Sequence, residues 1–216
     1  MMALIVLTAG AAVFVQGQTD SARAVTKAQT VGLSEIGLRQ MVQELDQAYQ
    51  LEFPTSTANT GCTESGAGVQ PCNIADALVR LSSTGFSGTD FEVRYDCTVA
   101  STTVVGDRAC WRYLCSASAS TAANSTCTAA STGLLSKRLV IDDVINGTTA
   151  SPVFSFCYPN SAATGSSCAT GATRATSATV TINVPAAGSL SSAAGGDKTT
   201  VILTSGLYLS DLDLDQ

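Results

Sequence analysis

The chain has 216 residues, eight cysteines, no histidine and a formal net charge of −6. This length suits one good-sized domain with an appendage. The 11 lysines and arginines are scattered, which argues against a nucleic-acid partner because phosphate binding needs clustered basic side chains. Without histidine the chain lacks the commonest general base and metal ligand, so we expect no enzyme, no metal site and no cofactor.

The cysteines indicate an exported protein. None of the eight forms a C-x-x-C pair, which disfavours zinc-binding and thioredoxin-like interpretations. An even cysteine count in a chain rich in Ser, Thr, Ala and Gly is typical of disulfides formed outside the cytosol.

The first fifteen residues, MMALIVLTAGAAVFV, carry no charge. The run is slightly shorter than the roughly 20 apolar residues of a membrane-spanning helix. A secretory signal peptide is the alternative, because Ala22-Arg23-Ala24 has the small-x-small form of a cleavage site. No basic residue precedes the apolar run, however, although signal peptides begin with positive charge.

A helix is predicted over residues 1–53. No proline occurs between Ser21 and Phe53, and Pro54 ends the pattern. Apolar residues recur at spacings of three and four from Ile36 to Tyr49. Such a helix is about 80 Å long at 1.5 Å per residue, so its first half must be covered by a membrane or by other copies. The residues expected to make that contact are Met1, Leu4, Ile5, Leu7, Val13 and Phe14.

Residues 54–216 are predicted to form a β-rich head. Residues 73–81 (NIADALVRL) read as a short helix or turn, followed by segments rich in β-branched and aromatic residues. Those segments are 90–97, 109–115, 134–144, 153–158, 178–184 and 199–209. The expected fold class is α+β, with a long N-terminal α-helix followed by an antiparallel β-sheet head that carries long disulfide-closed loops.

The cysteine spacing favours sequential pairing, although eight cysteines allow 105 pairings. Cys97 and Cys110 end and begin neighbouring strand segments, and the other pairs bracket polar loops. Cys110 and Cys115 could exchange partners. The predicted disulfides are Cys62–Cys72, Cys97–Cys110, Cys115–Cys127 and Cys157–Cys168.

The order of these segments resembles type IV pilins and type II secretion pseudopilins. The nearest likeness is to PilW-type minor pilins and J-type pseudopilins. It is carried by residues 37–49 (GLRQMVQELDQAY), 111–113 (WRY), 139–144 (LVIDDV), 154–158 (FSFCY) and the final strand pair, 180–184 and 201–209. The family's early glutamate is missing, since no acidic residue precedes Asp20. We therefore expect about six mature residues and a short basic leader upstream of Met1, which would complete a span of roughly 20 apolar residues; the alternative is a subunit that lacks the glutamate.

The resemblance implies a structural subunit of a pilus-like or pseudopilus helical filament, anchored in the inner membrane before assembly and displayed at the cell surface afterwards. The implied partners are copies of itself or other pilins, an inner-membrane assembly platform and a prepilin peptidase. Two alternatives stay open: a minor pilin or J-type pseudopilin of a tip complex, and a secreted adhesive protein with a signal peptide.

Four further sequence features each have a functional and a structural interpretation. No serine has the S-x-x-K spacing of a Ser-Lys hydrolase. Asp142-Asp143 suits calcium or a solvated strand end. The tail carrying Asp211, Asp213 and Asp215 suits a solvated terminus or a contact with basic residues of the next subunit. Asn124 and Asn146 begin N-glycosylation triplets, although Asn146-Gly147 is also a turn signal.

Overall fold

The computed structural model describes most of the chain as one long helix and nine strands. It covers residues 2–48, 50–52, 69–81, 89–116, 127, 131, 133–148, 150–157, 177–185 and 200–208. For residues 2–14 and for some others inside the helix and strands it describes the backbone alone. The elements are α1 (Met2–Asp46), β1 (Gln50–Glu52), β2 (Val69–Cys72), β3 (Ile74–Leu81), β4 (Thr89–Ala100), β5 (Arg108–Ser116), β6 (Leu134–Val144), β7 (Phe154–Cys157), β8 (Ser177–Pro185) and β9 (Thr200–Tyr208).

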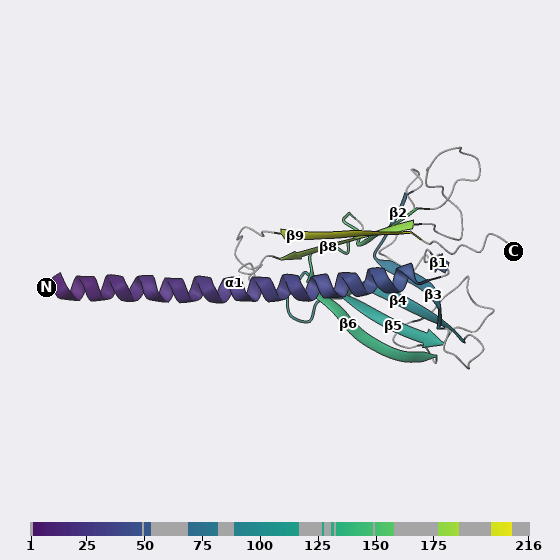
Figure 1. Ribbon diagram of the computed structural model, residues 1–216, viewed down its shortest axis with the longest axis horizontal. Helices are drawn as coiled ribbons and strands as arrows, with labels where there is room; N and C mark the ends of the chain where they lie inside the picture. Colours follow the sequence, from purple (N-terminus) through teal and green to yellow (C-terminus); the bar gives the residue numbers. More distant parts are fainter. Residues whose placement is uncertain are drawn as a thin grey trace.

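The predicted fold class is wrong in its account of the head. A single antiparallel sheet was expected, whereas the described strands form two antiparallel sheets. One has the order β1-β3-β4-β5-β6 and the other the order β2-β7-β8-β9. Strands dominate everything described beyond α1, so the head is a two-sheet β structure, and the helix packs between its layers (Figure 1).

Residues 73–81 were predicted as a helix or turn, and this is also wrong. They contain β3, which pairs with β1 on one side and β4 on the other. Each side chain from Cys72 to Val79 is buried, so both faces of the strand are covered. A strand buried on both faces loses the apolar–polar alternation that identifies a strand in sequence.

The boundary between helix and head also lies earlier than predicted. Helix α1 ends at Asp46 rather than Phe53. The chain then forms β1, in which Leu51 lies opposite Ala77 of β3. Leu51 is fully buried, so residues 50–52 belong to the head and not to the helix.

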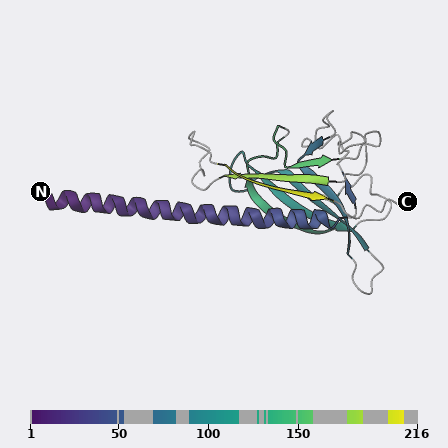
Figure 2. The same cartoon turned by 45° about the horizontal axis from the view of Figure 1, so that its top comes forward.

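The core lies between the two sheets, around the last turns of α1. Leu38, Met41 and Leu45 point into it, with the i, i+3, i+7 spacing of one helix face. The sheets contribute the largest buried side chains, which are Tyr95, Phe154, Phe156, Leu51, Ile74 and Ile182. The earlier turns of α1 extend away from the head, as the turned view makes plain (Figure 2). At about 1.5 Å per residue the whole helix of 45 residues is about 68 Å long.

Candidate assembly surface

Helix α1 exposes large apolar side chains along its length. Val15, Val25, Leu33 and Ile36 are each more than half exposed. At about 100° per residue these four positions fall within an arc of roughly 80° on the helix. We call them the outer stripe. Exposed aliphatic residues that align along one helix face mark an interaction surface more often than scattered ones do.

The stripe is free of charge among the described side chains. Glu35 and Arg39, which form an ion pair with 2.6 Å between Oε1 and Nη2, lie on another side of the helix. The stripe also avoids the face that packs into the head, since Ile36 is exposed while its neighbours Gly37 and Leu38 are buried. Helix α1 therefore has two apolar faces, one used within the chain and one unused.

A close approach of backbones fixes the helix on β6. A Cβ atom at Gly37 would lie 2.5 Å from Ile141 Cγ1 and 2.9 Å from the Val140 carbonyl oxygen. Real Cβ atoms do not come so near, so this contact requires glycine. Gly32, one and a half turns earlier, has no atom within 4 Å of such a Cβ.

A polar network attaches α1 to the head at a second place. The Glu44 carboxylate on α1 accepts hydrogen bonds from Tyr95 Oη (2.6 Å) and Arg112 Nε (2.6 Å) through Oε2, and from Gln40 Nε2 (2.9 Å) through Oε1. Tyr95 of β4 is fully buried. Arg112 of β5 is mostly buried. One carboxylate thus ties the helix to two adjacent strands.

The network sets the ionisation of both acidic members. Burial alone raises the pKa of Glu44, but the hydrogen bonds from Arg112, Tyr95 and Gln40 outweigh burial, so the pKa is lowered from its usual value. Burial is also the main reason that the pKa of Tyr95 is strongly raised, and the hydrogen bond to the Glu44 anion adds to it. Glu44 is therefore the charged member and Tyr95 the neutral donor at neutral pH.

Sequence reasoning missed this network. The segment containing Trp111-Arg112-Tyr113 was noticed for its residue types, and Glu44 lies among the apolar positions of the helix. A carboxylate there is a signal, since a charge beside a buried stripe needs a partner. The partners lie 51 and 68 residues away in sequence, which no local pattern reveals.

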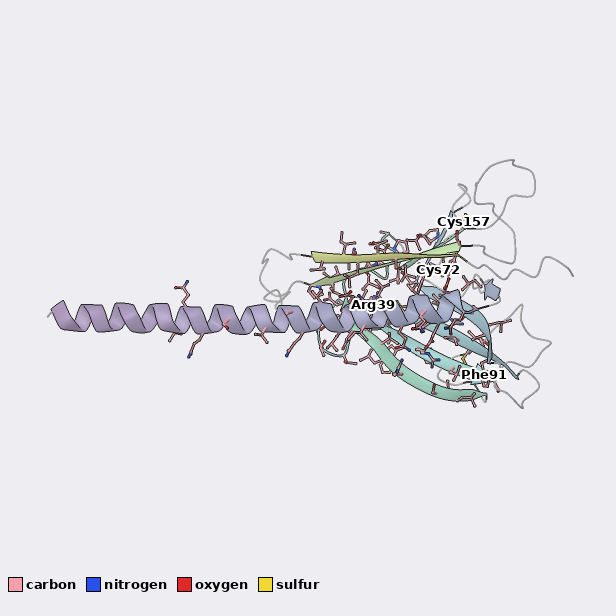
Figure 3. All side chains as sticks on the ribbon, viewed as in Figure 1. Arg39, Cys72, Phe91 and Cys157 are labelled. Atoms are coloured by element: carbon pink, nitrogen blue, oxygen red, sulfur yellow. A yellow bond between two sulfur atoms is a disulfide. The ribbon has the colours of Figure 1, made fainter. Side chains whose placement is uncertain are left out.

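Four of the expected disulfide cysteines are paired as predicted. The structure joins Cys97 to Cys110 across β4 and β5, and Cys115 to Cys127. Cys72 on β2 and Cys157 on β7 are each disulfide-bonded, and they lie at the end of the head farthest from the N-terminus of the helix (Figure 3). Their predicted partners, Cys62 and Cys168, lie outside the described residues.

The Asn146 side chain, which begins a predicted glycosylation triplet, is engaged inside the fold. Its side chain is buried, and Nδ2 donates to the carbonyl oxygens of Thr181 (2.7 Å) and Pro152 (3.2 Å). Its Oδ1 accepts from the Asn183 amide at 2.9 Å. Gly147 follows with a φ of 96°, a left-handed turn conformation that favours glycine. Asn124 lies outside the described residues.

Replacing Asn146 by alanine should lower the free energy of unfolding by about 2 kcal/mol, because three buried backbone groups lose their partner. Urea unfolding of the protein with its disulfides intact measures this change in the free energy of unfolding. The matched control is Thr148→Ala, an exposed residue two positions away, which should change stability by less than about 0.5 kcal/mol. A glycan detected on Asn146 of the folded protein would contradict this placement.

The acidic pair Asp142-Asp143 lies at the C-terminal end of β6, beside the β4–β5 loop. Asp143 Oδ1 accepts from the hydroxyls of Ser101 (2.6 Å) and Thr103, and Asp142 Oδ2 accepts from Thr102 at 2.9 Å. These contacts explain the pair as a strand end that accepts hydrogen bonds from the hydroxyls of the β4–β5 loop. Within the described ranges no three His, Cys, Asp or Glu residues gather as metal ligands. The acidic tail, Asp211, Asp213 and Asp215, lies outside those ranges.

The apolar N-terminal segment is described as backbone. Residues 2–14 belong to α1, while the side chains of the expected contact residues, Leu4, Ile5, Leu7, Val13 and Phe14, and all of Met1, lie outside what is described. In the part of the chain that the structure describes, no helix is long and apolar enough to cross a membrane.

Comparison with known proteins leaves the chain without an assigned relative: no family model, no curated protein and no solved structure matches it.

Proposed function

We propose that the chain is a structural subunit of a type IV pilus-like or pseudopilus helical filament, assembled through its N-terminal helix. The observation that carries the proposal is the helix itself: it continues beyond the head, and the outer stripe runs from its protruding turns onto the turns that pack on the head. An isolated helix that leaves its domain gains little from its own backbone bonds. It is stable in water when its apolar face packs against other helices.

The way α1 joins the head supports a role as a filament subunit. The Gly37 contact holds the helix against β6, and the Glu44 network holds it against β4 and β5 of the same sheet. Two disulfides among the described residues clamp β4 to β5 and β5 to Cys127. In this proposal, tension on the head reaches the helix through these attachments.

Subunits of such a filament are related by one repeated, non-closing contact. In this proposal the outer stripe of one copy packs against the helices of its neighbours, and the β head forms the outer layer. The partners are other copies or other pilins, an inner-membrane assembly platform and a prepilin peptidase. The subunit is held in the inner membrane by the N-terminal segment before assembly and reaches the cell surface in the filament. No catalytic role is proposed.

The double substitution Leu33→Glu and Ile36→Glu should lower filament incorporation about tenfold or more, because buried unpaired carboxylates cost several kcal/mol at a packed interface. The measurement is immunoblotting of filaments sheared from the cells that make the protein, with electron microscopy of the labelled fibres. Val105→Glu is the matched control, since Val105 is 90% exposed but lies in the β4–β5 loop. It should assemble normally.

Two results would contradict the proposal. One is normal incorporation of the Leu33/Ile36 variant when circular dichroism shows the same head fold as the parent. The other is a mature N-terminus near Val25, found by sequencing the purified protein, because cleavage there removes the first half of α1 and favours the secreted adhesive alternative.

A further inference from the structure

Strand β6 is an edge of the five-stranded sheet among the described strands. It pairs with β5 on one side, and no other described strand pairs with it on the other side. Its residues 135–139 are all exposed, although the strand is 11 residues long. Such an edge presents backbone N–H and C=O groups that can accept another strand. The edge is therefore a second surface of the molecule, separate from the outer stripe of α1.

The two faces of this edge differ in chemistry. Lys137 and Leu139 lie on the face of their cross-strand neighbours Tyr113 and Trp111, and the Lys137 ammonium sits 4.3 Å from the Trp111 ring centroid. Arg138 lies on the other face, which points toward α1.

Arg138 is an exposed positive charge on this edge. It is directly opposite Arg112, whose guanidinium is already bound to Glu44. In the ranges that the structure covers, no acidic group lies within ion-pair distance of Arg138. The edge thus offers an exposed arginine on one face and an exposed leucine on the other.

We propose that the β6 edge binds the acidic segment at residues 211–215 of a second copy of this chain, by strand addition. The segment reads Asp-Leu-Asp-Leu-Asp. In an added strand the three carboxylates lie on one face and the two leucines on the other. This alternation matches Arg138 on one face of β6 and Leu139 on the other.

Charge favours the acidic segment, rather than the β6 edge of a second copy, as the strand that pairs here. Two β6 edges would bring Lys137 and Arg138 of each copy together, and like charges across a strand pair are destabilising. An acidic strand gains both backbone hydrogen bonds, which supply affinity, and the Arg138 contact, which supplies selectivity. The contact joins heads, so it goes beyond the helix packing of the proposed filament and would add to it.

Peptide binding to the whole chain tests the inference. The probe is a fluorescent peptide of residues 209–216, and the receptor is the full chain carrying Asp211→Asn, Asp213→Asn and Asp215→Asn, so that its own segment does not compete. Fluorescence anisotropy should show saturable binding that weakens with salt. Arg138→Glu should weaken it about tenfold, through a lost attraction and a new repulsion.

Three controls make the result decisive. Arg39→Glu makes the same change in net charge on α1, outside the strand that receives the peptide, and should leave binding unchanged. A peptide of the same composition in the order Asp-Asp-Asp-Leu-Leu breaks the alternation and should bind at least several-fold more weakly. Arg138→Gln removes the positive charge without adding a negative one and should give an intermediate affinity for the peptide.

Equal weakening by Arg39→Glu and Arg138→Glu, or equal binding of the rearranged peptide, would overturn strand addition. Hydrogen exchange identifies the occupant: protection of amides 135–139 in the unmodified chain should rise with protein concentration. Protection that is independent of concentration means that the chain's own segment covers the edge, which would overturn the second-copy assignment. Normal filament incorporation of the Leu33/Ile36 variant, with peptide binding intact, would contradict the proposed function alone.

Discussion

Glu44→Ala should lower the free energy of unfolding by about 3 kcal/mol. The substitution leaves the buried Tyr95 hydroxyl and the Arg112 guanidinium without their shared acceptor, and each unsatisfied buried group costs about 1–3 kcal/mol. Glu44 itself is about a quarter exposed, so water offsets part of the loss. Chemical denaturation followed by circular dichroism measures the change.

The effect of Glu44 should depend on pH. The pKa of its carboxyl is lowered in the folded chain, so ionised Glu44 contributes stability above the usual carboxyl pKa of 4.5. That contribution is lost as pH falls through the lowered folded-state pKa. The stability difference between the parent and Glu44→Gln should therefore be largest near pH 7 and shrink below about pH 4.

Glu35→Gln is the control for this experiment. Glu35 forms an exposed i,i+4 ion pair with Arg39 on the same helix, and such pairs contribute about 0.3–0.5 kcal/mol. A Glu44→Gln variant whose stability differs from that of the parent by the same amount at pH 7 and pH 3.5 would show that the carboxylate does not act through its charge.

The sequence indicated some features well, and those features are local. Leu38, Met41 and Leu45 are buried as their spacing predicts, because three- and four-residue steps return to one helix face. Cys97–Cys110 and Cys115–Cys127 are separated by only 13 and 12 residues, so short hairpins and loops bring them together.

Features that depend on distant parts of the chain were missed or misread. Ile36 was assigned to the same apolar face as Leu38, but it is exposed, because α1 has two apolar faces and periodicity does not tell them apart. The polar residues of β3 prevented its recognition as a strand. Asp76 is buried, with its Oδ2 3.4 Å from Arg94 Nη1 of β4, so the charged residue in the middle of the segment is not at the surface. Asn146 matched a modification triplet, yet its carbonyl and amide partners lie up to 37 residues away.

No local sequence pattern indicated that the strands divide into two sheets. Strands β2 and β3 are separated by Asn73 alone, but they belong to different sheets. Asn73 fixes the change from one sheet to the other. Its side-chain Oδ1 accepts a hydrogen bond from the Val153 amide at 2.9 Å, and its backbone carbonyl oxygen accepts one from the Cys97 amide at 2.9 Å. One residue thus bridges the layers, and the sequence shows it as an ordinary turn residue.

Gly37→Val should have the other large effect, lowering the free energy of unfolding by about 3 kcal/mol. A side chain at this position meets Ile141 Cγ1 and the Val140 carbonyl oxygen at distances no real Cβ adopts. The oxygen belongs to the backbone of β6, which its pairing with β5 holds in place, so the helix must move away. Overpacking of this kind costs about 1–3 kcal/mol, and the second methyl group of valine adds to it.

Gly32 separates this steric effect from helix propensity. Alanine favours a helix interior over glycine by about 1 kcal/mol, and a Cβ at Gly32 meets no atom within 4 Å. Gly32→Ala should therefore raise stability slightly, whereas Gly37→Ala should lower it by about 1–2 kcal/mol despite the same gain in propensity. Thermal unfolding of the two alanine variants side by side measures the opposite signs. If both variants are stabilised, α1 is not seated on β6 through Gly37, and the rigid link between head and helix on which the filament proposal depends would be lost.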